Sequence, residues 1–107
     1  MKLSMRPGLL ESVYEVCLAY ELKEKGLKIE QQVSVPVVYK KIRLETGFRI
    51  DILVEKSVIV ELKAVENLLP IHEAQVLTYL KLTGYRVGLL LNFNEVLIKN
   101  GIKRIVL

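Results

Sequence analysis

Apolar residues with the period of a helix mark two segments of the chain. Between residues 8 and 25 they recur every three or four positions, and Gly26 follows as a natural C-terminal cap. Residues 69–84 show the same period, with Pro70 in the first turn and Gly84 after the last. The pattern therefore predicts two amphipathic helices.

The two-residue period of strands appears between the predicted helices. It covers residues 27–41, 43–54 and 57–65. Pro36 has no N–H group, so we expect a sheet edge or a bulge there. After the second helix, residues 85–93 are a continuous apolar run typical of a strand buried on both faces. Residues 95–107 divide around Asn100-Gly101, which predicts a terminal hairpin. The order of elements indicates an α/β fold.

Two acids interrupt the apolar strands of the segment DILVEKSVIVELK, residues 51–63. A turn centred on Lys56 pairs the apolar residues on one face, Val54 with Val58, Ile52 with Val60 and Ile50 with Leu62. A shift of one residue would break that face. The same register sets Asp51 opposite Glu61 on the other face, where Cβ atoms lie about 4.5–5.5 Å apart. Lys63 follows Glu61 by two positions and points to the same face.

Three interpretations of these charges remain open on spacing alone. An exposed sheet face would pair Glu61 with Lys63 and Asp51 with Arg49, and such surface pairs contribute only about 0–1 kcal/mol. A metal-free catalytic pair of carboxylate and lysine is the second interpretation. The third is a divalent cation site, because hard cations take carboxylate and carbonyl oxygens together with water.

Composition narrows the class of protein. The 107 residues fit one domain, residues 1–107, and 51% are hydrophobic, which supports a packed core. No apolar run approaches the roughly 18–20 residues of a membrane span, so we expect no membrane partner. Cys17 is the only cysteine and no signal peptide is visible, which favours a cytoplasmic protein. The net charge of +4 is compatible with nucleic acid.

The spacing Asp-x9-Glu-x-Lys resembles the core motif of the PD-(D/E)XK nuclease superfamily. PGLLESVYE resembles the signature of the GxxExxY protein family, carried here by Gly8, Glu11 and Tyr14. VELKAVENL, AQVLTYLKLTG and GLLLNFN…IKNGIKRIV resemble that family in the same order, so the resemblance extends from Pro7 to Val106. It implies a restriction-endonuclease-like core (helix-strand-strand-strand-helix-strand) with a mixed sheet, followed here by the C-terminal hairpin.

The resemblance also implies roles for individual residues. Asp51, Glu61, the backbone carbonyl of Leu62 and Glu11 would ligate Mg²⁺ or Mn²⁺. Glu11 would do so directly or through water. Lys63 would position the attacking water or stabilise the charge that develops at the phosphate. On spacing alone, an acid such as Glu11 near a helix start is also explained by the helix dipole.

Three further residues would contact the nucleic acid. Tyr14 lies three positions after Glu11 and shares its helix face. Gln75 and Tyr79, four positions apart, are similar to the Gln-x-x-x-Tyr motif of several branches of the superfamily. Spacing alone favours ordinary packing for Tyr14 and Tyr79 and an exposed position for Gln75.

The function that we expect is metal-dependent hydrolysis of phosphodiester bonds in DNA or RNA. A catalytically inactive nucleic-acid-binding module on the same fold is one alternative, and a protein-interaction domain with a charged sheet face is another. The resemblance implies a longer lead-in than the six residues before Pro7. Apolar surface exposed by its loss, together with free strand edges, leads us to expect a homodimer.

Overall fold

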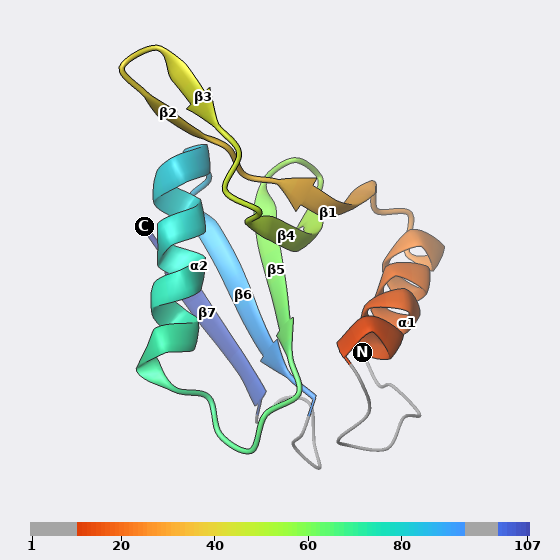
Figure 1. The fold of residues 1–107 in the computed structure, drawn as a ribbon. Coiled ribbons are helices and arrows are strands. Elements are labelled where there is room, and N and C mark those ends of the chain that lie inside the picture. The colour runs from red at the N-terminus through yellow and green to blue at the C-terminus, as the bar shows by residue number, and fades with distance from the viewer. Residues whose placement is uncertain (1–10, 94–100) are drawn as a thin grey trace.

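A computed structural model describes residues 11–93 and 101–107, which form two helices and seven strands (Figure 1). The elements are α1 (Glu11–Glu24), β1 (Ile29–Ser34), β2 (Val37–Tyr39), β3 (Ile42–Leu44), β4 (Arg49–Val54), β5 (Val58–Lys63), α2 (Pro70–Thr83), β6 (Val87–Asn92) and β7 (Ile102–Val106). Neither helix in the described ranges is long and apolar enough to cross a membrane.

The central sheet has five strands in the order β1-β4-β5-β6-β7. β5 and β6 run parallel, and the other neighbours run antiparallel. A parallel pair needs a crossover connection, which α2 supplies. The mixed sheet and the helices confirm the α/β class and the restriction-endonuclease-like core.

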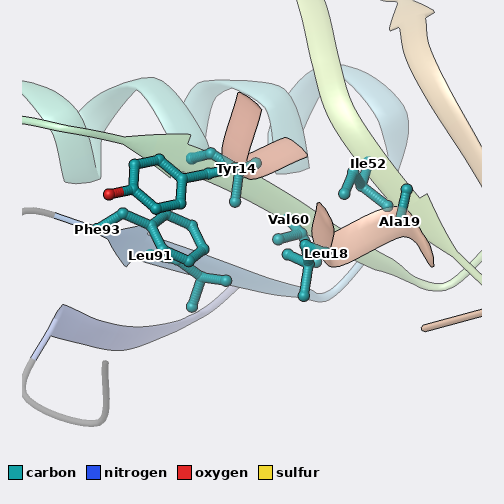
Figure 2. Close-up of a cluster of buried hydrophobic side chains, with 8 residues drawn as sticks. Tyr14, Leu18, Ala19, Ile52, Val60, Leu91 and Phe93 are labelled. Carbon is teal, nitrogen blue, oxygen red and sulfur yellow. The ribbon is translucent and has the colours of Figure 1, made fainter. Parts of the chain in front are cut away.

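Helices cover both faces of this sheet, and each contributes to a buried cluster. The α1 cluster consists of Tyr14, Leu18, Ala19, Ile52, Val60, Leu62, Leu91 and Phe93 (Figure 2). The α2 cluster consists of Val35, Ile50, Leu53, Ile59, Val76, Tyr79, Leu80 and Leu90. β5 and β6 contribute to both clusters, so the apolar run of residues 85–93 does form a strand buried on both faces.

The strand predictions before β5 were too long. Residues 27–41 form β1 and β2, which are separated at Pro36, and residues 43–54 form β3 and β4. The second break includes Gly47, whose φ of 78° is a conformation that glycine adopts readily. Among the described residues, β2 and β3 pair only with each other, as a two-stranded ribbon outside the central sheet.

Side-chain alternation reverses in the middle of β1, which the sequence pattern did not predict. Ile29 packs against the α1 cluster, whereas Val33, of the same parity, packs against the α2 cluster. Gln32 lies between them with φ 52°, in the left-handed region. A single residue in that conformation turns the following side chains to the other face of the sheet.

The C-terminal prediction is described only in part. Its last strand is β7, which pairs antiparallel with β6, from Val87 opposite Val106 to Leu91 opposite Ile102. The predicted first strand of the hairpin and Asn100 lie outside the described residues. Gly84 ends α2 as predicted, with φ 85° and an N–H bond to the Leu80 carbonyl.

Candidate active site

The hairpin of β4 and β5 has the predicted register near its turn. Val54 lies opposite Val58, and Ile52 lies opposite Val60. The predicted single apolar face ends there, because Ile50 belongs to the α2 cluster. Leu62, its predicted partner, belongs to the α1 cluster instead. At the level of Asp51 and Glu61, the apolar side chains of the two strands therefore no longer share one face of the sheet.

Side chains of the two acids form the next hydrogen bonds between these strands. The backbone N–H of Asp51 donates to Oε1 of Glu61 at 3.1 Å. The backbone N–H of Leu62 donates to Oδ2 of Asp51 at 2.8 Å. Each carboxylate is thus held by the backbone of the other strand, which fixes both acids close together.

Burial distinguishes these acids from surface charges. Glu61 is only 2% exposed and Asp51 is half-buried, so the interpretation as an exposed sheet face is wrong. Burial, followed by the negative charge of Asp51, raises the pKa of Glu61 to about 8. Burial also raises the pKa of Asp51, although hydrogen bonds from Leu62 and Gln32 act in the opposite direction.

Lys63 supplies positive charge to the same site. It is half-buried, and its charge lowers the pKa of both Asp51 and Glu61 against the larger effect of burial. Within the described ranges it forms no ion pair with Glu61, and the guanidinium of Arg49 donates to Ser34 rather than pairing with Asp51. The two surface pairs of the exposed-face interpretation are therefore absent from this part of the chain.

The backbone of β5 alternates in direction around these residues. The Lys63 carbonyl accepts a 2.8 Å hydrogen bond from the N–H of Phe93, on the β6 side. Leu62 faces the other way, because its N–H bonds to Asp51 on β4. In an extended strand the N–H and C=O of one residue point to the same side, so the Leu62 carbonyl also faces β4.

Glu11 lies at the first turn of α1, near the end of β5. Its Oε1 accepts a 3.3 Å hydrogen bond from the N–H of Ala64, the residue after Lys63. Its charge contributes to the raised pKa of Asp51. Glu11 precedes Asp51 by 40 positions in the sequence. The structure nevertheless brings it to the edge of the site formed by Asp51 and Glu61.

A polar network behind Asp51 was not found from the sequence. Nε2 of Gln32 donates to Glu15 at 2.6 Å and lies 3.4 Å from Oδ1 of Asp51. Gln31 donates to the other carboxylate oxygen of Glu15 at 2.9 Å. Two signals were available: Glu15 follows Glu11 by four positions on one helix face, and paired glutamines interrupt an otherwise alternating strand.

Asn92 was also missed. It is 0% exposed, at the end of β6 opposite Lys63. Its side chain accepts from the Val65 N–H at 3.0 Å and donates to the Val65 carbonyl at 2.9 Å. This two-bond clamp fixes the chain immediately after Lys63. The available signal was a polar residue at the end of a strand that is otherwise buried.

Gln75 and Tyr79 lie on α2, which covers the face of the sheet opposite to α1. The Gln75 amide donates to the Tyr79 hydroxyl at 3.0 Å. Burial raises the pKa of Tyr79, and the charges of Glu61 and Asp51 raise it further. A groove of about 320 Å³ adjoins the pair and is lined by Phe48, Ile71, His72, Gln75, Thr78 and Tyr79. Tyr79 is only 4% exposed; it lies near enough to the acids for their charges to act on it, and it lines the groove together with Gln75.

Tyr14 lies on the other face of the sheet, in the α1 cluster. It is 1% exposed and its ring stacks on that of Phe93, with centroids 4.3 Å apart (Figure 2). This position corresponds to the packing role that spacing alone favoured. Contact between Tyr14 and nucleic acid stays a prediction from the resemblance.

The donor set can be tested against a divalent cation. The described residues contain no group of three or more His, Cys, Asp or Glu side chains placed to hold an ion. Asp51, Glu61 and the Leu62 carbonyl form a smaller set of oxygen donors. Mg²⁺ commonly binds one or two carboxylates and keeps several waters. A cation would also offset the negative charge that burial disfavours in both carboxyls. The residues therefore fit Mg²⁺ or Mn²⁺.

Comparison with known proteins identifies a family for the chain. A model of the PD-(D/E)XK nuclease superfamily matches residues 3–105. No curated protein and no solved structure matches the chain. The match names the superfamily and not the narrower GxxExxY family. Because it covers nearly the whole sequence, the chain belongs to the PD-(D/E)XK nuclease superfamily.

Proposed function

We propose that this protein is a divalent-metal-dependent nuclease that hydrolyses phosphodiester bonds in DNA or RNA. The observation that carries the proposal is the pair of carboxylates on β4 and β5. Asp51 and Glu61 are each bonded to the backbone of the opposite strand, and Glu61 is buried. Membership of a nuclease superfamily supports the same reaction class.

The residues have separate roles in this proposal. Asp51, Glu61 and the Leu62 carbonyl hold Mg²⁺ or Mn²⁺, and Glu11 joins them directly or through a water. The ion, when bound, supplies Lewis acidity and lowers the pKa of water at the site. Lys63 places a positive charge beside the scissile phosphate and stabilises the negative charge of the transition state.

Gln75 and Tyr79 are proposed to contact the nucleic acid next to the scissile phosphate. Their hydroxyl–amide bond of 3.0 Å orients both groups. The adjoining groove combines the ring of Phe48, which lies 5.8 Å from the Tyr79 ring, with polar groups on α2. Such a surface suits a sugar or base better than an isolated phosphate, because it offers an apolar wall beside hydrogen-bonding groups.

Calorimetric titration with Mn²⁺, followed by digestion of single-stranded, duplex and branched substrates, tests the proposal. We expect saturable ion binding and Mn²⁺-dependent cleavage of at least one substrate. Binding of the ion and of nucleic acid without cleavage would support the inactive module, because superfamily membership does not itself establish activity. Failure to bind either would refute the proposal.

We also propose that the protein forms a homodimer. The outward surface of α1 supports this, because Val13, Val16 and Tyr20 are spaced at three and four positions and are exposed. A helix with an apolar outer stripe is typical of one that packs against a further element. Light scattering at micromolar concentration should give twice the monomer mass, and a monomer mass would refute this part of the proposal.

A further inference from the structure

The β2–β3 ribbon stands apart from the rest of the fold. In the part of the chain that the structure describes, its strands pair only with each other, and in Figure 1 the ribbon projects beyond the end of the central sheet. Residues 38–45 are all exposed. A two-stranded ribbon without a core gains little stability by itself, so its exposed side chains need another explanation than packing.

The ribbon turns through Lys40 and Lys41. Tyr39 lies opposite Ile42, which leaves these two lysines as the whole turn. Both have positive φ, 49° and 68°. Tight hairpin turns with two such residues strongly favour Asn-Gly, because a Cβ atom disfavours this conformation. The sequence instead puts two ammonium groups at the tip, in a conformation that lysine adopts with difficulty.

The charge at this tip is not neutralised within the ribbon. Residues 37–45 contain three basic side chains and one acidic side chain, a net charge of +2. The acid, Glu45, pairs with Arg43 at 3.0 Å. Within the described ranges, Lys40 and Lys41 form no ion pair. Nζ of Lys40 lies 5.4 Å from the centre of the exposed Tyr39 ring, so cationic and aromatic groups lie together.

We propose that the β2–β3 ribbon is a second binding surface for double-stranded nucleic acid, with Lys40 and Lys41 contacting backbone phosphates. A two-stranded β-ribbon fits the major groove of a duplex. Contacts to phosphates carry no sequence information, so the ribbon provides affinity without sequence preference. The inference rests on the proposed function in taking nucleic acid as the partner.

Chain connectivity supports a link between this surface and the acids. β3 ends at Leu44, and β4, which carries Asp51, begins at Arg49. The short connection is held by two hydrogen bonds, from Val35 N–H to the Phe48 carbonyl at 3.0 Å and from Thr46 Oγ1 to the Val35 carbonyl at 2.9 Å. A duplex bound at the ribbon is therefore held at a defined position relative to the site.

The double variant Lys40→Asn with Lys41→Gly tests the proposal, because it removes both charges and supplies the preferred turn sequence. We expect a thermal midpoint no lower than that of the parent protein. Duplex affinity, measured without divalent metal, should fall at least tenfold at low salt. The slope of log affinity against log salt should become shallower by about two, since each phosphate contact contributes about 0.9.

Two charge controls accompany it. Lys40→Arg with Lys41→Arg keeps both charges and should retain the parent affinity. Lys23→Gln with Lys25→Gln removes two exposed charges at the end of α1 and should change the slope much less. Equal losses in the α1 and ribbon variants would overturn the proposal, because they would indicate a general effect of net charge.

The remaining outcomes separate this inference from the nuclease proposal. Ribbon-dependent duplex binding in a protein that cleaves nothing would refute the nuclease activity and support the ribbon. Cleavage by a protein whose duplex affinity and salt slope do not depend on Lys40 and Lys41 would overturn the ribbon alone. Ribbon-dependent binding to anionic phospholipid vesicles, with no binding to duplex, would also overturn it.

Discussion

The backbone N–H of Asp51 donates a 3.1 Å hydrogen bond to the carboxylate of Glu61, so each acid of the site affects the environment of the other. The charge of Asp51 contributes to the high pKa of Glu61. Burial is the larger cause, and it acts on both carboxyls. The ionisation of the pair is therefore coupled to folding.

The stability of the metal-free protein should fall as pH rises from about 4.5 to about 8, the ordinary and the folded-state pKa of Glu61. In that window the folded chain keeps a proton on Glu61 that the unfolded chain has lost, so Glu61 by itself contributes a slope of at most about 1.4 kcal/mol per pH unit. The raised pKa of Asp51 acts in the same direction. Urea unfolding across this range measures the slope.

Glu61→Gln is the control for this pH dependence. It keeps the size of the side chain and removes the ionisation. The free energy of unfolding of this variant should change less with pH than that of the parent protein. An unchanged slope in the variant would show that other groups cause the dependence.

Glu61 and Lys63 should differ in their effects on metal and on rate. Glu61→Ala deletes a proposed ligand, so Mn²⁺ binding and cleavage should be lost together. Lys63→Ala should keep most of the metal affinity but lose cleavage by about 10²–10³-fold, because one stabilising group is removed. Calorimetry and single-turnover digestion separate the two quantities.

Glu66→Ala provides a matched control for these variants. Glu66 is an exposed acid five positions after Glu61. Its removal should change neither the Mn²⁺ affinity nor the rate of cleavage. If Lys63→Ala loses metal binding as completely as Glu61→Ala, the separation of roles is wrong.

The sequence predicted the meeting of the two acids because local rules determine it. The turn at Glu55-Lys56-Ser57 and the apolar pairs beside it allow one register, and that register brings Asp51 to Glu61. A resemblance in sequence added Glu11, which lies far away in the chain. Neither source required the acids to be buried, because burial depends on how α2 covers the second face of the sheet.

The reversals of side-chain direction could not be predicted from alternation. The rule assumes that every residue of a strand is extended, and Gln32 is not. On β4, Ile50 and Ile52 also pack in different clusters although they share one parity. At Asn92 and Glu15 the sequence signals an unusual polar position, but it does not identify the distant segment that each side chain contacts.

Asn92→Ala should loosen the connection between β5 and α2. The change removes both side-chain bonds to the Val65 backbone and leaves its N–H and C=O without these partners. We expect a loss of roughly 1–3 kcal/mol in the free energy of unfolding. Hydrogen exchange of the Val65 amide should accelerate more than that of amides in β1, and equal protection in variant and parent would contradict the clamp.

Tyr14 variants distinguish packing from substrate contact. Tyr14→Ala should lower the free energy of unfolding by about 3–5 kcal/mol, because the ring is buried against Phe93. Tyr14→Phe keeps the ring and should cost only about 1 kcal/mol. If Tyr14→Phe leaves nucleic-acid affinity and cleavage unchanged, the side chain acts in the core. A folded Tyr14→Phe protein with weakened binding would support the role implied by the resemblance.

Gly88 on β6 should be required for the close packing of α2 against the sheet. A Cβ atom at this position would lie 2.5 Å from Cγ1 of Val76, which is buried at the centre of the α2 cluster. Gly88→Ala should therefore cost about 1–3 kcal/mol through overpacking. Chemical denaturation of each variant measures this loss.

The double variant Gly88→Ala with Val76→Ala shows whether this contact is the cause. Removing the Val76 methyl groups makes room for the new Cβ atom, so the two losses should not add. We expect the double variant to be more stable than their sum predicts by roughly 0.5–3 kcal/mol, the range for residues in contact. Additive losses would show that the contact with Val76 is not the cause. Because Tyr79 lies three residues after Val76 on the same helix, Gly88→Ala should also weaken any nucleic-acid binding that depends on Tyr79.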